Sequence, residues 1–383
     1  MDENCSMVIE NASIVTPVGV LENAAIRVED GIIAAVGECG SHGRSSSCRR
    51  IDGTGLYVFP GLIDLHGDAV EKEIEPRPGS LFPVGMAIVE MDKRLAAAGI
   101  TTMYQSLSFS NEPSKVRHVD MASSIAREVN RLAPVLGVRT FVHARYETSC
   151  LEAVPFLEQL LNEGQVHHIS LTCHYIDGAK AGLDNPGAPR LLLAPEARQI
   201  VDLCHRLGVP VASHDDDYEA KLDALEQLGV RYTEFPISME IARSAAGRGM
   251  RISLGAPNIV RGVSKNNKLS AREAIKKGYC DIICSDYTPM SVFHAIFTLV
   301  REEILPLHEA VNMASFNPAR EMGIAGYTGS LEPGKRADIL LVDASGDIPR
   351  ILTTFVEGRE VYTTFRSPAG LSHYTKEVIP GEV

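Results

Sequence analysis

Short apolar segments alternate with longer amphipathic segments through most of the chain. From residue 59 onward, eight apolar runs of strand length are separated by turn residues and by segments of helical periodicity. The predicted strands are residues 61–65, 100–104, 138–143, 167–172, 209–213, 230–234, 250–254 and 281–285. The predicted helices include residues 85–98, 117–132, 151–163, 195–207, 217–228, 238–248 and 270–277. Eight such alternations over about 270 residues favour a (β/α)8 barrel over an open sheet.

The two ends of the chain have a different pattern. Residues 7–36 contain short β-runs broken by turn residues, and β-texture returns after residue 330. Between the first β-runs and the barrel, residues 39–50 are rich in Gly, Ser and Arg, which predicts an exposed loop. The fold class that we expect is α/β, a distorted (β/α)8 TIM barrel with a small β-sandwich domain built from both termini. The barrel would span residues 59–330, and the sandwich would combine 1–58 with 331–383.

Composition and charge narrow the class of protein. With 383 residues, of which 45% are apolar and 22% charged, the chain has an ordinary globular profile. No apolar run approaches the ~20 residues that span a bilayer, and the acidic N-terminus does not resemble a secretory signal. The net charge of −12 disfavours binding to nucleic acid or to an anionic membrane surface. We expect a small-molecule partner instead.

Eight cysteines are scattered along the chain, and none forms a Cys-x-x-Cys pair. This distribution is typical of reduced thiols, so we expect a cytoplasmic protein. We also expect it to assemble as a homo-oligomer, as a dimer.

Candidate chemistry appears where the predicted strands end. Active sites of (β/α)8 barrels lie at the carboxyl ends of the strands. The polar residues directly past these runs are His66, Asp68, His143, Arg145, Glu147, His174, His214 and Asp286. Gathered carboxylates repel one another unless cations neutralise them, and mixed imidazole and carboxylate ligands suit Zn, Mn or Fe. The pattern therefore predicts a site for divalent metal ions, with His66 and Asp68 on one face of their strand.

An acidic chain that takes an anionic small substrate needs cations at the site to reverse its negative field locally. The candidates are Arg77, Arg145, Arg261 and Lys265, of which Arg145 is favoured because it alternates with Glu147 on one strand. No GxxxxGK[ST] loop occurs, which excludes a P-loop as the phosphate cradle. His143 is expected to support the site from beneath, and His168 to lie in the core.

Several motifs resemble one family across essentially the whole chain. The segments "VFPGLIDLHGD", "ASH", "SDYTP", "MASFNPAREMGI" and "GSLEPGKRADILLVD" resemble the amidohydrolase superfamily. Within it, "GDAVEKEIEPRPG", "HARYE", "ASHDDD" and "GAPNIVRG" are similar to its phosphonate-metabolism diphosphatase branch. Two segments, "CHYIDGA" and "GVSKNN", depart from the pattern of that branch.

The resemblance implies a function and a set of roles. It implies hydrolysis of a ribose 1-phosphonate 5-triphosphate to the 5-phosphate and pyrophosphate, with two divalent ions, zinc foremost, and manganese or iron as alternatives. By position, His66 and Asp68 would hold one ion, Glu147 would bridge, and His174 and His214 would hold the second. Asp286 would bind metal and take the proton from the attacking water.

Two other functions stay open at this point. One is a metal-dependent deaminase or cyclic-amide hydrolase, because the same activated water can attack carbon and the fold does not choose. The other is a metal-free barrel that serves as a scaffold. The gathered His, Glu and Asp residues disfavour the scaffold.

Overall fold

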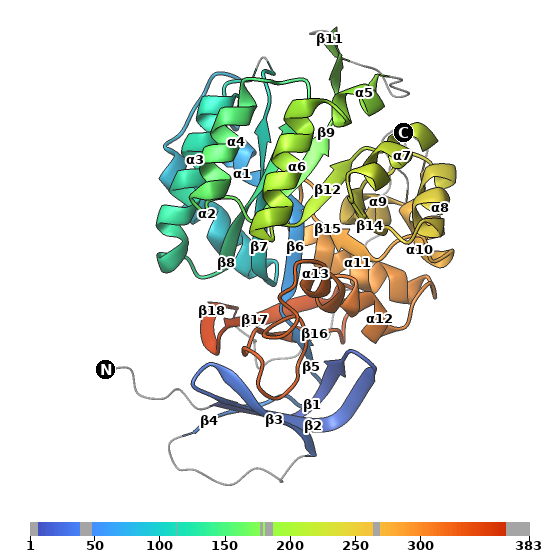
Figure 1. The fold of residues 1–383 in the computed structure, drawn as a ribbon. Coiled ribbons are helices and arrows are strands. Elements are labelled where there is room, and N and C mark those ends of the chain that lie inside the picture. The colour runs from blue at the N-terminus through green and yellow to red at the C-terminus, as the bar shows by residue number, and fades with distance from the viewer. Residues whose placement is uncertain are drawn as a thin grey trace, which may run out of the picture.

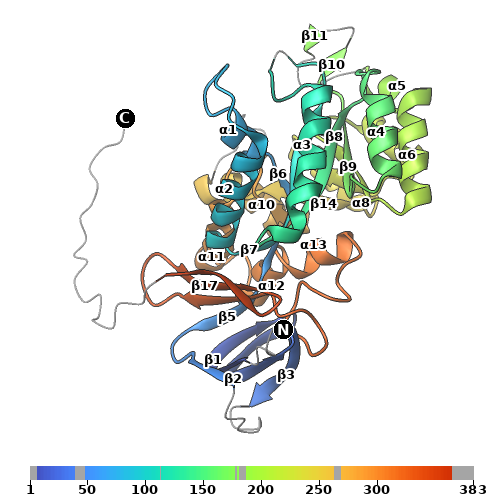
Figure 2. The same ribbon diagram turned by 90° about the vertical axis from the view of Figure 1, so that its left-hand side faces the viewer.

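The computed structural model describes residues 7–38, 48–112, 114–176, 179–180, 187–262 and 269–364. It shows a helix-covered barrel with a separate sheet packed at one end (Figure 1). Both termini supply strands to that sheet, so the chain leaves it, builds the barrel and returns (Figure 2). The predicted fold class, a TIM-type barrel with an appended β-unit from both ends, is confirmed.

The barrel consists of eight parallel strands in sequential order. They are β6 (Leu62–Gly67), β7 (Ile100–Phe109), β8 (Arg139–Glu147), β9 (His168–Thr172), β12 (Val211–His214), β13 (Tyr232–Glu234), β14 (Arg251–Gly255) and β15 (Ile282–Cys284). Each predicted strand coincides with one of them. A parallel bridge between Gly67 and Asp286 joins the last strand region to the first. This bridge brings the end of β6 next to the segment that follows β15.

The helices cover the outside of the barrel because each buries one apolar face. In α3, Val119, Ala122, Ile125, Ala126 and Val129 are buried at helical spacing, and polar residues occupy the other face. The helices are α1 (Ala69–Ile74), α2 (Val84–Ala97), α3 (Val119–Leu132), α4 (Ala153–Asn162), α5 (Ala188–Leu192), α6 (Pro195–Leu207), α7 (Glu219–Gln227), α8 (Met239–Gly247), α9 (Ala256–Arg261), α10 (Ala271–Lys276), α11 (Met290–Arg301), α12 (Leu307–Asn312) and α13 (Phe316–Glu321).

Local signals fix several helix ends. The hydroxyl of Ser238 accepts a hydrogen bond from the amide of Ile241 and so caps α8. Helix α6 begins with Pro195 and ends before Gly208, whose φ of 70° is the left-handed conformation that glycine adopts at helix ends. A short 3-10 turn (Ala133–Val135) follows α3, and a small hairpin pairs β10 (Tyr175–Ile176) with β11 (Ala179–Lys180).

The terminal sheet contains eight strands of the described chain in the order β18-β17-β16-β5-β1-β2-β3, with β4 beside β1. They are β1 (Met7–Thr16), β2 (Gly19–Glu29), β3 (Ile32–Glu38), β4 (Arg49–Asp52), β5 (Tyr57–Pro60), β16 (Ile339–Asp343), β17 (Arg350–Val356) and β18 (Arg359–Thr363). Strand β1 pairs parallel with β4 and β5, and the other pairs are antiparallel. The sheet has its own apolar core, which includes Ile14, Ile26, Ile339 and Phe355. The domain limits near residues 58 and 331 stay a prediction.

A separate apolar cluster packs against the first strand of the barrel. Ala319, Met322 and Ile324, from α13 and the turn after it, pack with Ile63 and Leu65 of β6. Strand β6 starts where β5 leaves the sheet, so the amino ends of the barrel strands face the sheet (Figure 1). The carboxyl ends, where the sequence predicts chemistry, therefore lie on the side away from the sheet.

Two further expectations concern membrane and redox state. Among the residues that the structure describes, no helix has both the length and the apolar composition needed to cross a bilayer. Within the described parts of the chain, the cysteines at 48, 150, 173, 204, 280 and 284 form no disulfide bond. The homodimer and the cytoplasmic location stay predictions.

Candidate active site

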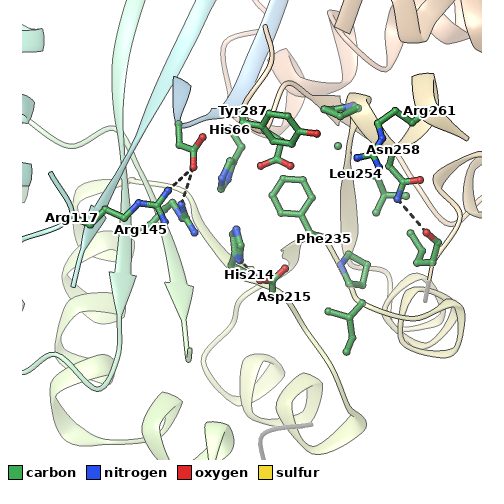
Figure 3. Close-up of a pocket in the computed structure, with 17 residues that line it drawn as sticks. His66, Arg117, Arg145, His214, Asp215, Phe235, Leu254, Asn258, Arg261 and Tyr287 are labelled. Atoms are coloured by element: carbon green, nitrogen blue, oxygen red, sulfur yellow. Dashed lines mark hydrogen bonds and ion pairs between the residues drawn. The ribbon is translucent and has the colours of Figure 1, made fainter. Parts of the chain in front are cut away.

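A cavity of about 640 Å³ lies at the carboxyl ends of the barrel strands. Its volume lies within the range of about 300–1,000 Å³ that is usual for small-molecule sites. Figure 3 shows His66, Arg117 and Arg145 on one side of this space, and Phe235, Leu254, Asn258 and Arg261 on the other. The residues that line it are His66, Asp68, Arg117, Arg145, His214, Asp215, Phe235, Pro236, Ile237, Leu254, Gly255, Pro257, Asn258, Arg261, Leu269, Asp286 and Tyr287.

The residues predicted from the sequence fall into four groups. Those that line the cavity are His66, Asp68, Arg145, His214, Arg261 and Asp286. Glu147 and His174 lie beside one another but are not among the lining residues. Arg77 is exposed in a turn closed by a bridge to Ser80 and does not line the cavity. Lys265 lies outside the described residues.

One set of possible metal ligands combines His174, His214 and Asp215. Nε2 of His174 lies 3.0 Å from Oδ2 of Asp215, and Nδ1 of His214 lies 3.3 Å from the same oxygen. Burial lowers the pKa of His214 to about 4, so its imidazole is neutral near pH 7 and can offer a lone pair. Burial alone would raise the pKa of Asp215, but His214 and His174 outweigh it and hold the pKa well below its usual range. The set therefore offers neutral nitrogen and anionic oxygen donors.

Glu147 lies at the end of β8, directly beside this set. Its Oε2 accepts hydrogen bonds from the amide of His174 at 2.9 Å and from the hydroxyl of Thr172 at 3.2 Å. The hydroxyl of Ser149 donates to its other oxygen at 3.0 Å. Nδ1 of His174 is 3.8 Å from Oε2 of Glu147. The carboxylate thus fixes the backbone that carries His174.

A second set of possible ligands lies deeper and combines His66, His143 and Glu234. All three are buried, and Nδ1 of His66 lies 2.9 Å from Oε2 of Glu234. Burial would raise the pKa of Glu234, but the charge of His66 outweighs it and keeps the pKa well below its usual range. Burial would likewise lower the pKa of His66, yet Glu234 outweighs burial and raises it. The two side chains form a buried carboxylate–imidazole pair.

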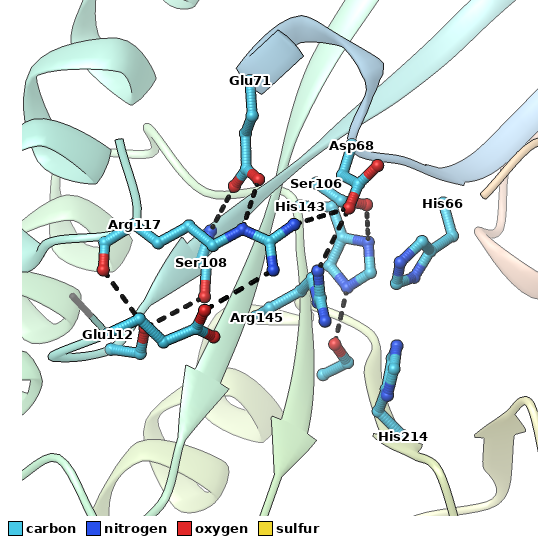
Figure 4. Close-up of polar contacts among 12 residues, drawn as sticks. His66, Asp68, Glu71, Ser106, Ser108, Glu112, Arg117, His143, Arg145 and His214 are labelled. Carbon is cyan, nitrogen blue, oxygen red and sulfur yellow. Dashed lines mark hydrogen bonds and ion pairs between the residues drawn. The ribbon is translucent and has the colours of Figure 1, made fainter. Parts of the chain in front are cut away.

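His143 is held in one orientation by hydrogen bonds to Leu65 of β6, Ser106 of β7 and Ser170 of β9. Figure 4 shows it beside Ser106 and His66. Its Nδ1 lies 3.0 Å from the carbonyl oxygen of Leu65, which can only accept, so Nδ1 carries a proton. Burial lowers the pKa of His143 well below its ordinary value, so the ring is neutral and its Nε2 accepts from the hydroxyl of Ser170 at 2.9 Å. Both nitrogens are thus already engaged. His143 supports His66 from beneath, and their rings meet edge to face at 5.0 Å.

Asp286 lies directly after β15 at the point where the barrel closes. The amide of Asp286 donates a hydrogen bond to the carbonyl oxygen of His66 at 2.9 Å. The carbonyl oxygen of Asp286 accepts one from the amide of Asp68 at 2.8 Å. The φ of 57° at Asp286 is unusual for a residue other than glycine, and such conformations are found at functional sites. Burial raises the pKa of Asp286 to about 6. The carboxyl group therefore lies in the cavity with a proton affinity near neutrality.

Three charged residues of the site were not identified from the sequence. Asp215 is the first member of the acidic run that follows His214, and the run by itself does not tell which acid faces the cavity. Glu234 ends an apolar strand, which was a usable signal, because an acid there must point into the barrel or to solvent. Arg117 was predicted as the first residue of helix 117–132, but α3 begins at Val119, so Arg117 lies in the loop between β7 and α3 and lines the cavity.

The side chains fit the divalent ions that the sequence predicts. Their donors are imidazole nitrogen and carboxylate oxygen, the mixture that suits zinc, manganese and iron. Within the described residues, each of the two sets offers three ligand atoms that all lie within 4.8 Å of one another. Asp68 belongs to neither set.

Comparison with known proteins relates this arrangement to enzymes. Residues 176–367 match the model of the Amidohydrolase family. α-D-Ribose 1-methylphosphonate 5-triphosphate diphosphatase of Escherichia coli (strain K12) is 28% identical over 385 residues, which cover 93% of this chain and 100% of that protein. Enamidase of Eubacterium barkeri is 24% identical and covers 91% of this chain and 92% of its own. Dihydropyrimidinase from Brevibacillus agri NCHU1002 superposes with a TM-score of 0.69 at 15% identity, covering 94% of this chain and 95% of its own, which is a likeness of fold.

Proposed function

The chain belongs to the amidohydrolase family, and from this membership we propose that it is a metal-dependent diphosphatase of a phosphorylated sugar. The substrate proposed is a ribose 1-phosphonate 5-triphosphate, which would be cleaved to the 5-phosphate and pyrophosphate. The observation that carries the proposal is the joint presence of metal-type ligands and guanidinium groups around one cavity. Support also comes from the Escherichia coli diphosphatase, whose whole length this chain matches.

The charge of the cavity wall favours an anionic substrate. The whole chain has a net charge of −12, so an anion is repelled unless cations are concentrated at the site. Arg117, Arg145 and Arg261 line the cavity. Arg145 is only 9% exposed, and its Nε has no hydrogen-bond partner among the described residues. A buried guanidinium with free donors is suited to paired contacts with phosphate oxygens.

Metal ions would be held by side chains of the site described above, and His143 is left out of the assignment because both of its ring nitrogens are already engaged. We assign His174, His214 and Asp215 to one ion, with Glu147 beside them, and His66 and Asp286 to a second. A bound divalent ion supplies a nucleophilic water near neutral pH and neutralises phosphate charge. Zinc, manganese and iron all suit these donors.

Side chains of the protein would transfer the proton and bind the phosphate groups. Asp286 takes the proton from the attacking water, because its carboxyl group is buried in the cavity with a pKa of about 6. Arg145 binds a phosphoryl oxygen and so orients the anhydride bond. Arg261 is the last residue of α9, where it can contact the outer phosphates of the triphosphate substrate.

An alternative reaction on the same scaffold is hydrolysis of a cyclic amide or deamination. Phe235, Ile237 and Leu254 give the cavity an apolar wall that suits a flat ring. The relatives include enamidase and imidazolonepropionase, which fits such chemistry. The guanidinium groups of Arg117 and Arg145, on the opposite wall, favour the diphosphatase.

The test compares products on a substrate panel. The full chain is supplied with Zn, Mn or Fe and incubated with ribose 1-phosphonate 5-triphosphates, nucleoside triphosphates, cyclic imides and aminated heterocycles. Release of pyrophosphate, absent in Asp286→Asn, would support the proposal. Release of ammonia or ring opening without pyrophosphate would replace it with the alternative. Arg131→Met serves as a control, because that side chain is 66% exposed and distant in sequence from the site.

A further inference from the structure

A cluster of alternating charges at one wall of the cavity combines Asp68, Arg117 and Arg145, which line the cavity, with Glu71 behind them (Figure 4). The two acids come from the end of β6 and from α1, Arg117 comes from the β7–α3 loop, and Arg145 comes from β8. Oδ2 of Asp68 contacts both guanidinium groups, Nη2 of Arg117 at 3.0 Å and Nη1 of Arg145 at 3.6 Å. Asp68 is therefore the carboxylate that joins the two arginines.

The two arginines differ in how fully they are neutralised. Nε of Arg117 donates to Glu71 at 2.7 Å, and its terminal nitrogens approach Asp68 at 3.0 Å and Glu112 at 3.7 Å. Arg117 thus faces three carboxylates. Among the described residues, Arg145 has one ion-pair contact, with Asp68 at 3.6 Å, which is too long for a hydrogen bond. Its guanidinium keeps donors available at the cavity wall.

The position of Asp68 argues against the metal-binding role that the sequence suggested for it. The ligand sets of the described residues group His66 with His143 and Glu234, and they leave Asp68 out. The carboxylate of Asp68 instead points to the arginines, with Arg117 as its closest charged partner. A carboxylate held in this way is a poor candidate to turn toward an ion.

We propose that Asp68 is a positioning residue for Arg145 and not a metal ligand, and that Arg117 acts through Asp68. Arg117 draws the carboxylate of Asp68 to itself, so that Asp68 orients Arg145 without neutralising it. Arg145 then presents its guanidinium to a phosphoryl group. That the anion is phosphate rests on the proposed function, whereas the reassignment of Asp68 does not.

The first measurement is the metal content of purified Asp68→Asn. After loading with zinc and removal of excess ions, this variant should carry as much metal per chain as the wild type, whereas His66→Ala should carry less. If Asp68→Asn loses as much metal as His66→Ala, then Asp68 is a ligand and the proposal is overturned. Because this readout requires no substrate, it stands even if the chain hydrolyses no triphosphate.

The second measurement is a double-mutant cycle on the binding of inorganic pyrophosphate to the metal-loaded protein by calorimetry. Arg117→Met frees Asp68 to pair closely with Arg145, so we expect pyrophosphate to bind about tenfold more weakly, which corresponds to about 1.4 kcal/mol. In the Asp68→Asn background the same change should have little effect, because Arg117 acts through Asp68. Arg117→Lys should retain most of the binding, because it keeps the charge.

Two outcomes of the cycle would contradict the proposal. If Arg117→Met weakens binding equally in both backgrounds, then Arg117 contacts the anion directly and Asp68 is not its intermediary. If Arg117→Met binds pyrophosphate as tightly as the exposed-site control Arg131→Met, then Arg117 has no part in presenting Arg145. Should Arg117→Met not fold, Arg117→Lys and the metal content of Asp68→Asn still decide between the roles.

Discussion

Replacing Glu234 with glutamine removes one negative charge from the centre of the barrel and keeps the shape of the side chain. Glu234 is fully buried, and its Oε2 lies 2.9 Å from Nδ1 of His66. Its Oε1 lies 3.6 Å from Nε2 of His168. Glutamine offers an oxygen at only one of these positions and an N–H donor at the other. The change therefore tests whether the carboxylate holds His66 for its work in the cavity.

The size of the effect follows from these contacts. A hydrogen bond to a charged group contributes about 1.5–3 kcal/mol, and breaking a buried ion pair costs about 3–5 kcal/mol. Because glutamine keeps one acceptor, we expect the free energy of unfolding to fall by about 2–4 kcal/mol. Residues that orient a metal ligand change metal affinity by about 10–100-fold when replaced. We expect the affinity of Glu234→Gln for zinc to fall within this range.

Two assays separate stability from metal binding. Urea unfolding of the metal-free protein gives the change in free energy, and competition with a fluorescent chelator gives the zinc affinity. Glu90→Gln is the matched control, because the Glu90 side chain is 50% exposed and pairs with Lys93 on the surface of α2. If Glu234→Gln is destabilised but binds zinc as tightly as the wild type, then Glu234 stabilises the fold only, and its role in orienting His66 is refuted.

Three further predictions concern the catalytic group, the anion contact and the support of the metal loop. Asp286→Asn should keep the fold and much of the metal but lose turnover by about 10²–10⁴-fold, and steady-state kinetics with near-normal rates would remove its role as base. Arg145→Met should raise KM for polyphosphate substrates more than it lowers kcat, and an unchanged KM beside the Arg131→Met control would count against the anion contact. Lys221 is buried, and its Nζ lies 3.0 Å from Oδ1 of Asp216. The same Nζ donates hydrogen bonds to the backbone carbonyls of His214 and Asp215. Lys221→Met should therefore lower the free energy of unfolding, measured by urea titration, by about 3–5 kcal/mol. A loss no larger than that of a variant at an exposed lysine would contradict this.

The architecture was predictable because its signals are local. Apolar runs such as residues 250–254 and amphipathic segments such as 117–132 have the periodicities of strand and helix, and each coincides with an observed element. The barrel then follows from the alternation, and the strand ends follow from the barrel. This is why His66, His214 and Asp286, each at the end of a predicted run, could be expected at one cavity.

The partners of each side chain were not predictable in the same way. Asp68 follows His66 by two residues, which fits a ligand pair, but its carboxylate meets Arg117, a residue 49 positions away in the loop that precedes α3. Glu147 and His174 are held together by a hydrogen bond from the backbone amide of His174 to the carboxylate of Glu147. The spacing of the two residues in the sequence does not indicate this contact. Contacts of this kind depend on the register between strands and on loop paths, and a single sequence does not state either.

The central claim is that side chains from distant strand ends hold divalent metal ions in the cavity. The most direct test is the metal content of the purified full chain, after loading with zinc and removal of free ions, compared with that of His214→Ala. The account predicts near-stoichiometric metal in the wild type and a clear loss in the variant, with circular dichroism and thermal unfolding showing that both remain folded. A folded wild-type chain that retains no more metal than His214→Ala would contradict it.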